Sequence, residues 1–172
     1  SVEKWIKLAL DIILPRGITN VHDAWQDPTT VKVLQKLAEI DELPIRVYGM
    51  LGSSYPKLLR QFFNAGHFQS GNYTIRSAKA FIDGALGSRG AALLEPYCDD
   101  KNNCGLILIS NKEFKELAQR CRDAGFQLCT HAIGDRGNRI VLDVYSEAVN
   151  GLKNHRWRIE HAQMVCDEDI PR

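Results

Sequence analysis

Two histidines and one lysine hold comparable places along the sequence. His131 and His161 each end a segment with strand character, and Lys79 lies within a third such segment. Two imidazoles and one anionic oxygen donor form a suitable ligand set for zinc or a similar divalent metal. A lysine ammonium cannot bind a metal, so Lys79 would have to lose its proton or become carboxylated. The alternative that each histidine is a structural residue at a strand end stays open.

The lysine-bearing segment runs into a glycine-rich loop, "DGALGSRGA", which begins at Asp83. Asp83 lies four residues after Lys79 and therefore on the same face of a strand. Arg89 lies within the loop and offers a guanidinium to a substrate carboxylate or carbonyl oxygen. The loop matches neither of the glycine patterns that cradle phosphate. We interpret it as an active-site loop, with a tight structural turn as the alternative.

Four further positions carry weaker signals. Asp135 follows His131 by four residues and is predicted to cap the next helix. His22 ends a strand, and a structural role is favoured for it. Cys129 shares a face with His131 and is interpreted as a small buried residue rather than a thiolate ligand. Glu160 is predicted to point toward the helix layer, where an ion pair or support for a metal ligand remain open alternatives.

Five strand-like segments, starting near residues 17, 44, 75, 126 and 155, alternate with helices. The helices carry recognisable start signals: Asp27 before Pro28, and a capping box from Ser110 to Glu113. Most of the spacings are close to the roughly 30 residues of a βα unit. The exception is a segment of roughly 25 residues before the capping box, a length that is usually functional in a compact domain. The pattern predicts an α/β fold.

Five βα units predict part of a TIM-like (β/α) barrel, which has eight, and place the candidate residues at the carboxyl ends of its strands. The chain begins inside a helix and ends at "DEDIPR", which resembles another helix start. We therefore expect the central part of a barrel. A doubly wound sheet that binds a nucleotide is the alternative, but "VHDAWQDP" after the first strand contains no glycine for a phosphate loop.

The composition argues against several classes of protein. The chain has 172 residues and a formal net charge of +1, so no basic surface for nucleic acid or an anionic membrane is expected. Its longest apolar run near the N-terminus is too short and too charged to cross a bilayer. The five cysteines are odd in number and form no CxxC pair, which favours a reducing, cytoplasmic location.

Three segments together resemble the amidohydrolase superfamily, and within it amidohydrolase family 3, which includes enzymes like N-substituted formamide deformylase. They are "AKAFIDGALGSRGAAL", "THAIGDRGNRIVLDVYSEA" and "RIEHAQMV", in the family's order. The resemblance implies a TIM-like barrel with one or two divalent metals, usually zinc. The residues implied by motif match are the metal ligands Lys79 (carboxylated, on the fourth strand), His131 (fifth strand) and His161 (sixth strand), and the substrate-binding residues Arg89, Asp135 and Asp83.

The resemblance further implies that a metal-activated water attacks C–N bonds other than peptide bonds in small amide-like substrates. The chain departs from the family pattern in three places: it lacks the first-strand His-x-His pair, the eighth-strand aspartate and the β-sandwich segments. We therefore expect strands 2 to 6 of the family barrel, a fragment incomplete for catalysis. The alternative function is a non-catalytic α/β module that forms homo-oligomers through exposed strand edges.

Overall fold

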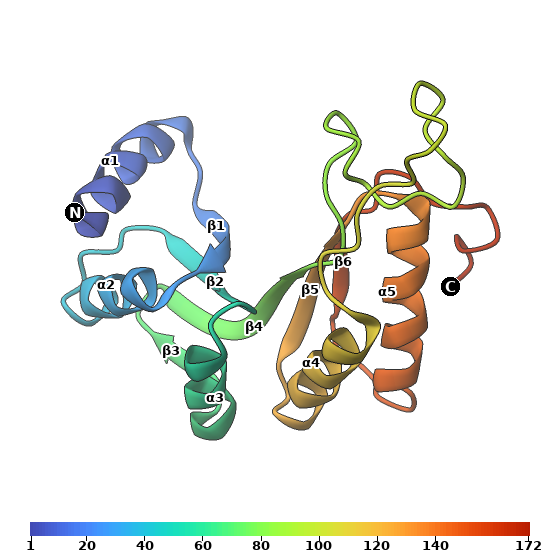
Figure 1. The fold of residues 1–172 in the computed structure, drawn as a ribbon. Coiled ribbons are helices and arrows are strands. Elements are labelled where there is room, and N and C mark those ends of the chain that lie inside the picture. The colour runs from blue at the N-terminus through green and yellow to red at the C-terminus, as the bar shows by residue number, and fades with distance from the viewer. The chain divides into compact units, whose positions relative to one another are not determined.

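Strands and helices alternate through the computed structural model of this protein, which describes residues 1–172 (Figure 1). The elements are α1 (Val2–Ile13), the short 3-10 helix η1 (Leu14–Arg16), β1 (Asn20–Gln26), α2 (Pro28–Glu39), β2 (Arg46–Gly52), α3 (Pro56–Ala65), β3 (Phe68–Ser70), β4 (Tyr73–Phe81), α4 (Asn111–Asp123), β5 (Gln127–Ala132), α5 (Asp135–Ala148) and β6 (Arg158–His161). None of the helices has the length and apolarity of a membrane span. The chain divides into two compact units, residues 1–78 and 79–172.

The first unit is a sheet in the order β1–β2–β4, with the short strand β3 paired to β4. Strands β1 and β2 are parallel, whereas β3 and β4 form an antiparallel hairpin. Helix α2 follows β1 directly because the Asp27 carboxylate accepts a hydrogen bond of 2.7 Å from the Thr30 amide and Pro28 occupies the first helical position. The predicted start of this helix is thereby confirmed.

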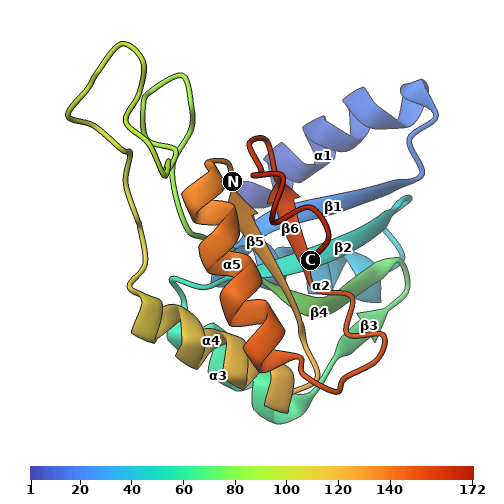
Figure 2. The same ribbon diagram turned by 90° about the vertical axis from the view of Figure 1, so that its right-hand side faces the viewer.

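The second unit contains the end of β4 and the parallel pair β5–β6. Helices α4 and α5 lie side by side against β5 (Figures 1 and 2). Phe114, Leu128 and Val141 are fully buried between the helices and the strand, and burying each such side chain stabilises the fold by about 1.5–3 kcal/mol. The predicted capping box starts α4, since Ser110 and Glu113 exchange hydrogen bonds between side chain and backbone.

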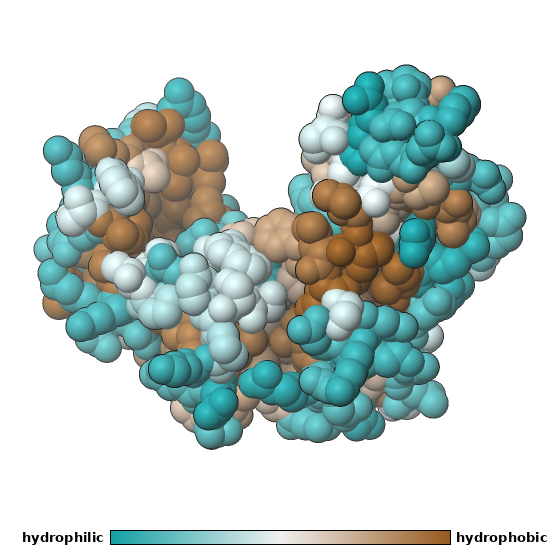
Figure 3. Space-filling model, in the orientation of Figure 1, coloured by the Kyte–Doolittle hydropathy of each residue, from teal (hydrophilic) through white to brown (hydrophobic).

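The long segment between β4 and α4 is ordered by its own backbone hydrogen bonds. The Leu93 amide donates to the Cys104 carbonyl at 2.8 Å, and the Leu108 amide returns to the Ile82 carbonyl at 2.9 Å. We call residues 84–108 the insertion. Its last turn exposes Leu106 and Leu108, which are 60% and 56% accessible. A brown patch covers this part of the second unit where the chain enters α4 (Figure 3), and such patches are typical of surfaces that pack against another segment or chain.

Element boundaries differ from the predictions at strand ends. The predicted strand 75–84 is β4, Tyr73–Phe81, and the predicted strand 155–163 is reduced to the four residues of β6. The strand β3 was not predicted, because three residues before a turn at Gly71 carry too short an alternation to recognise. The alternation of strands and helices itself agrees with the sequence pattern.

Asp169 anchors the end of the chain to α5 and should make stability depend on acid. Its buried carboxylate accepts hydrogen bonds from Arg139 at 2.8 Å and Arg172 at 3.0 Å; these partners, Arg139 first, lower the pKa of Asp169. A lowered carboxyl pKa stabilises the folded state above the unfolded pKa, and this stability is lost as pH falls through the folded pKa. Asp169→Asn should therefore lower the melting temperature at pH 7 and have a much smaller effect below about pH 3.

The control for this prediction is the exposed neighbour Asp167. Asp167→Asn should leave the melting temperature nearly unchanged at both pH values. Thermal unfolding of the two variants and the parent chain measures the effect. An equal loss at pH 7 and pH 3 for Asp169→Asn would assign the role of this residue to packing instead of charge.

Candidate metal centre

The two histidines predicted as metal ligands lie against each other in the second unit. The ring centroids of His131 and His161 are 4.8 Å apart, and the rings are nearly perpendicular. In the strand register His161 pairs with Ala132, which would place it on the face opposite His131. The positive φ of His161, 79°, departs from strand geometry at this point. Backbone strain of this kind is characteristic of functional sites.

Lys79 lies on the face of β4 that leads to His131. Its side chain is buried at 2% exposure, and its Nζ lies 3.9 Å from the ring centroid of Phe81, whose ring is in turn 5.0 Å from that of His131. Burial lowers the pKa of Lys79 to about 8, although Glu160 acts in the opposite direction. A lysine with a lowered pKa has a larger neutral fraction, and the neutral amine is the form that carbon dioxide can carboxylate.

Glu160 shares the face of His131, with which it is paired in the β5–β6 register. Residues paired across parallel strands point to the same side of the sheet. The predicted orientation of Glu160 toward the helix layer is therefore wrong. Its carboxylate accepts a hydrogen bond of 2.7 Å from Arg158 Nε. The sequence carried no signal for this position, because strict alternation counted back from His161 fails at the irregular end of β6.

His131 is enclosed by the end of β4. Its Nε2 lies 3.4 Å from Asp83 Oδ1 and 3.4 Å from the Gly84 carbonyl oxygen. Burial lowers the pKa of His131, and the Gly84 carbonyl opposes this shift. The ring is therefore neutral at physiological pH, which is the state in which an imidazole binds metal.

Asp83 is more deeply buried than a residue that binds substrate would be. Its side chain is fully buried, and its oxygens accept hydrogen bonds from the amides of Ala92 (3.0 Å), Ile133 (3.0 Å) and Gly134 (2.8 Å). Asp83 was predicted to bind substrate together with Arg89 and Asp135. A carboxylate occupied in this way favours a positioning role over a substrate contact.

The other two residues predicted to bind substrate lie in the insertion and at the start of α5. Arg89 is exposed, has a φ of 54°, and donates two hydrogen bonds to Asp99, at 2.8 and 3.1 Å. Asp135 is the first residue of α5, and its Oδ1 accepts a hydrogen bond of 2.9 Å from the Leu94 amide. Neither residue contacts His131 or Lys79 in a recorded hydrogen bond or ion pair, so their roles toward substrate stay predictions.

The first unit holds a separate polar cluster that sequence reasoning missed. The Tyr73 hydroxyl donates to Gln26 Oε1 at 2.5 Å, and Gln26 Nε2 donates to Asp23 at 2.8 Å. Burial raises the pKa of Asp23. The neighbouring His22 lies 4.9 Å from the Tyr48 ring, between centroids. These contacts agree with a structural role for the end of β1.

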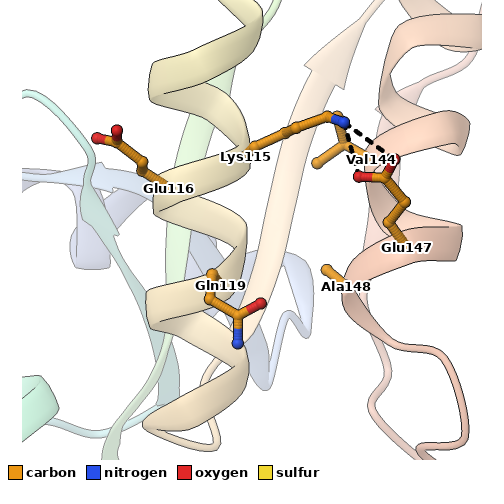
Figure 4. A pocket seen from close by; sticks show the side chains of 6 residues that line it. All are labelled: Lys115, Glu116, Gln119, Val144, Glu147 and Ala148. Atoms are coloured by element: carbon orange, nitrogen blue, oxygen red, sulfur yellow. Dashed lines mark hydrogen bonds and ion pairs between the residues drawn. The ribbon is translucent and has the colours of Figure 1, made fainter.

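A shallow groove of about 340 Å³ lies between α4 and α5 (Figure 4). The ion pair between Lys115 and Glu147, with 2.7 Å between nitrogen and oxygen, crosses it. Glu147 is near the end of α5, and in a βα unit the helix runs opposite to its strand. The groove therefore lies toward the amino ends of the strands, away from the histidine pair, and is a feature of the helix surface.

The donor set of the second unit fits part of a divalent metal site. Two imidazoles lie together with a buried lysine on the same sheet face. No three side chains of histidine, cysteine, aspartate or glutamate are grouped as ligands. A carboxylated Lys79 would supply the third, oxygen donor, and a zinc ion takes four ligands. The residues present therefore fit a metal as a partial ligand set.

Parallel strands joined by helices, with two candidate ligands near the strand ends, define the class of fold as that of a (β/α) barrel. The chain belongs to the amidohydrolase family, whose model matches residues 1–172. It is 38% identical over 95 residues to the putative amidohydrolase YtcJ of Bacillus subtilis, covering 55% of this chain and 18% of that protein. It is 25% identical over 154 residues to N-substituted formamide deformylase of Arthrobacter pascens, covering 85% and 28%.

A solved structure shows the same fold. An uncharacterized metal-dependent hydrolase from Pyrococcus horikoshii superposes with a TM-score of 0.90 at 29% identity, covering 99% of this chain and 34% of that protein. The predicted family and the predicted α/β fold, a partial TIM-like barrel, are thereby confirmed. The chain spans about a third or less of the length of these proteins.

Proposed function

We propose that this chain is the metal-binding central part of a hydrolase that cleaves C–N bonds, other than peptide bonds, in small amide-like molecules. The observation that carries the proposal is the convergence of His131, His161 and buried Lys79 within the second unit. The family match and the metal-dependent hydrolase of the same fold support it. The name of the formamide deformylase relative supports an amide as the substrate class.

In this proposal His131 and His161 bind a divalent metal, preferably zinc, and Lys79 supplies an oxygen ligand once carboxylated. A bound metal would supply an activated water near neutral pH. The chain's own residues hold the neutral imidazole of His131 in place and keep Lys79 out of bulk water, which favours its neutral form. Arg89, in the insertion, and Asp135, at the start of α5, would orient the substrate.

We also propose that the chain corresponds to strands 2 to 6 of the family barrel. Its coverage of about a third of the Pyrococcus protein supports this placement. The family's first-strand histidine pair, its eighth-strand aspartate and its β-sandwich would then come from the remainder of the enzyme. The 172-residue chain alone would bind metal weakly and turn over little substrate.

Metal removal tests the proposed activity in the full-length gene product that contains this chain. Small amides, including N-substituted formamides, are offered as substrates, and release of the free amine is followed. We expect hydrolysis that is lost after chelation and dialysis and restored by zinc. The isolated chain serves as the control and should show no turnover. Metal-loaded full-length protein that hydrolyses no member of the amide series would contradict the proposal.

A further inference from the structure

The Asp83 carboxylate joins three parts of the second unit. The end of β4 carries it, the insertion contributes the Ala92 amide, and the link between β5 and α5 contributes the amides of Ile133 and Gly134. These last two residues follow His131 by two and three positions. A buried carboxylate that accepts three amide hydrogen bonds holds each donor in a defined place.

Two acceptor oxygens lie near His131 Nε2. Asp83 Oδ1 and the Gly84 carbonyl oxygen each lie 3.4 Å from this nitrogen, and the Asp83 oxygens already accept three backbone amide hydrogen bonds. The neutral ring can donate toward these oxygens only with its proton on Nε2. Its other nitrogen, Nδ1, then carries the lone pair that a metal requires.

The backbone beside Asp83 is shaped to admit the carboxylate. A Cβ atom added at Gly137, in the first turn of α5, would lie 2.6 Å from Asp83 Oδ2. A Cβ at Gly134 would lie 1.9 Å from the Ala92 carbonyl oxygen. Side chains are therefore excluded on both sides of the interaction, and α5 approaches Asp83 closely enough for the Gly134 amide to reach it.

We propose that Asp83 is a positioning residue, whose carboxylate keeps the proton of His131 on Nε2, presents Nδ1 to the metal, and fixes the insertion and the start of α5 around that ring. The inference rests on the proposed function for the metal, whereas the proton position on His131 is a property of the metal-free chain. Partners behind a ligand histidine commonly set its orientation and change metal affinity 10–100-fold.

The proton position can be measured directly in the metal-free 172-residue chain. Long-range proton–nitrogen NMR distinguishes the two neutral forms of a histidine ring, and a His131→Gln spectrum assigns the signal. We expect neutral His131 to carry its proton on Nε2. A wild-type chain with the proton on Nδ1 would overturn the proposal without any variant at Asp83.

The isosteric variant Asp83→Asn tests the cause. An amide has one accepting oxygen, so its NH2 group must face either the amides of Ala92 and Gly134, or the Ile133 amide together with the Nε2–H of His131. We expect the neutral His131 signal to shift toward a mixture of the two forms and the zinc dissociation constant to rise about 10–100-fold. Asp123→Asn, at the exposed end of α4, is the matched control and should change neither quantity.

The outcomes separate this proposal from the proposed function. If Asp83→Asn is folded but keeps both the wild-type proton position and a zinc dissociation constant within twofold of wild type, Asp83 has no positioning role. If neither chain binds zinc but the proton moves in the variant, Asp83 positions His131, and the metal proposal is decided by the metal content of the full-length protein. If Asp83→Asn does not fold, the position of the proton on His131 in the wild-type chain decides whether the proposal stands.

Discussion

Replacing His131 and His161 together with alanine is expected to remove the bound metal and lower kcat/KM of the full-length hydrolase by at least about a thousandfold. A metal that polarises substrate and activates water is worth several kcal/mol of transition-state stabilisation, and each 1.36 kcal/mol corresponds to a factor of ten. The two rings lie 4.8 Å apart between centroids, so one double variant removes both proposed imidazole ligands from the second unit.

The measurement combines elemental mass spectrometry of the purified protein with steady-state kinetics on the best amide substrate. His67→Ala is the matched control, because His67 lies in the first unit just before β3 and outside the proposed site. It should retain metal and activity. Full metal content and unchanged kcat/KM in the double variant would show that other residues bind the metal.

Gly134→Ala is expected to destabilise the second unit by about 3 kcal/mol. The added Cβ would lie 1.9 Å from the Ala92 carbonyl oxygen and 2.5 Å from its carbon, and these are backbone atoms that cannot rotate away. This steric clash can be relieved only if the insertion moves away from the start of α5. That movement would weaken the hydrogen bonds from Ala92 and Gly134 to Asp83.

Urea unfolding followed by Trp157 fluorescence measures this loss in the second unit. Trp157 is the only tryptophan in residues 79–172, so Trp5→Phe and Trp25→Phe in the background leave a local reporter. Gly87→Ala is the matched control, since an added Cβ there meets no atom within 4 Å and should change stability by less than about 0.5 kcal/mol. Equal midpoints for the two alanine variants would contradict the predicted clash.

Much of the fold was predictable because local signals agreed with the final structure. The Asp27 and Ser110 caps start their helices where the sequence indicates, and the alternation of strands and helices predicted the α/β class. Strand ends were less predictable, because they depend on pairing partners. The chain around β3 illustrates this: its three residues are a strand only because β4 lies beside them.

The grouping of the candidate residues was predictable, whereas the contacts around them were not. Spacing and family motifs brought Lys79, His131 and His161 together, and the structure places them within one unit. The motif could not show that Asp83 is enclosed by backbone amides, since those donors come from residues 9 to 51 positions away. The alternation of side chains along a strand could not predict the face of Glu160 either, because the backbone of the next residue, His161, has a positive φ that does not occur in regular strands.

The insertion has a consequence for how substrate range can diverge in evolution. It closes on itself through Leu93 and Cys104 and returns to the end of β4 through Leu108. Arg89 precedes Leu93 and is paired to Asp99, which lies between Leu93 and Cys104, while the histidine pair lies outside the insertion. In the proposed enzyme, exchanging Arg89 or its neighbours in the insertion would alter which substrates are admitted without changing the proposed metal ligands. Such a separation would let the proposed hydrolytic centre acquire new specificities by changes confined to a single segment.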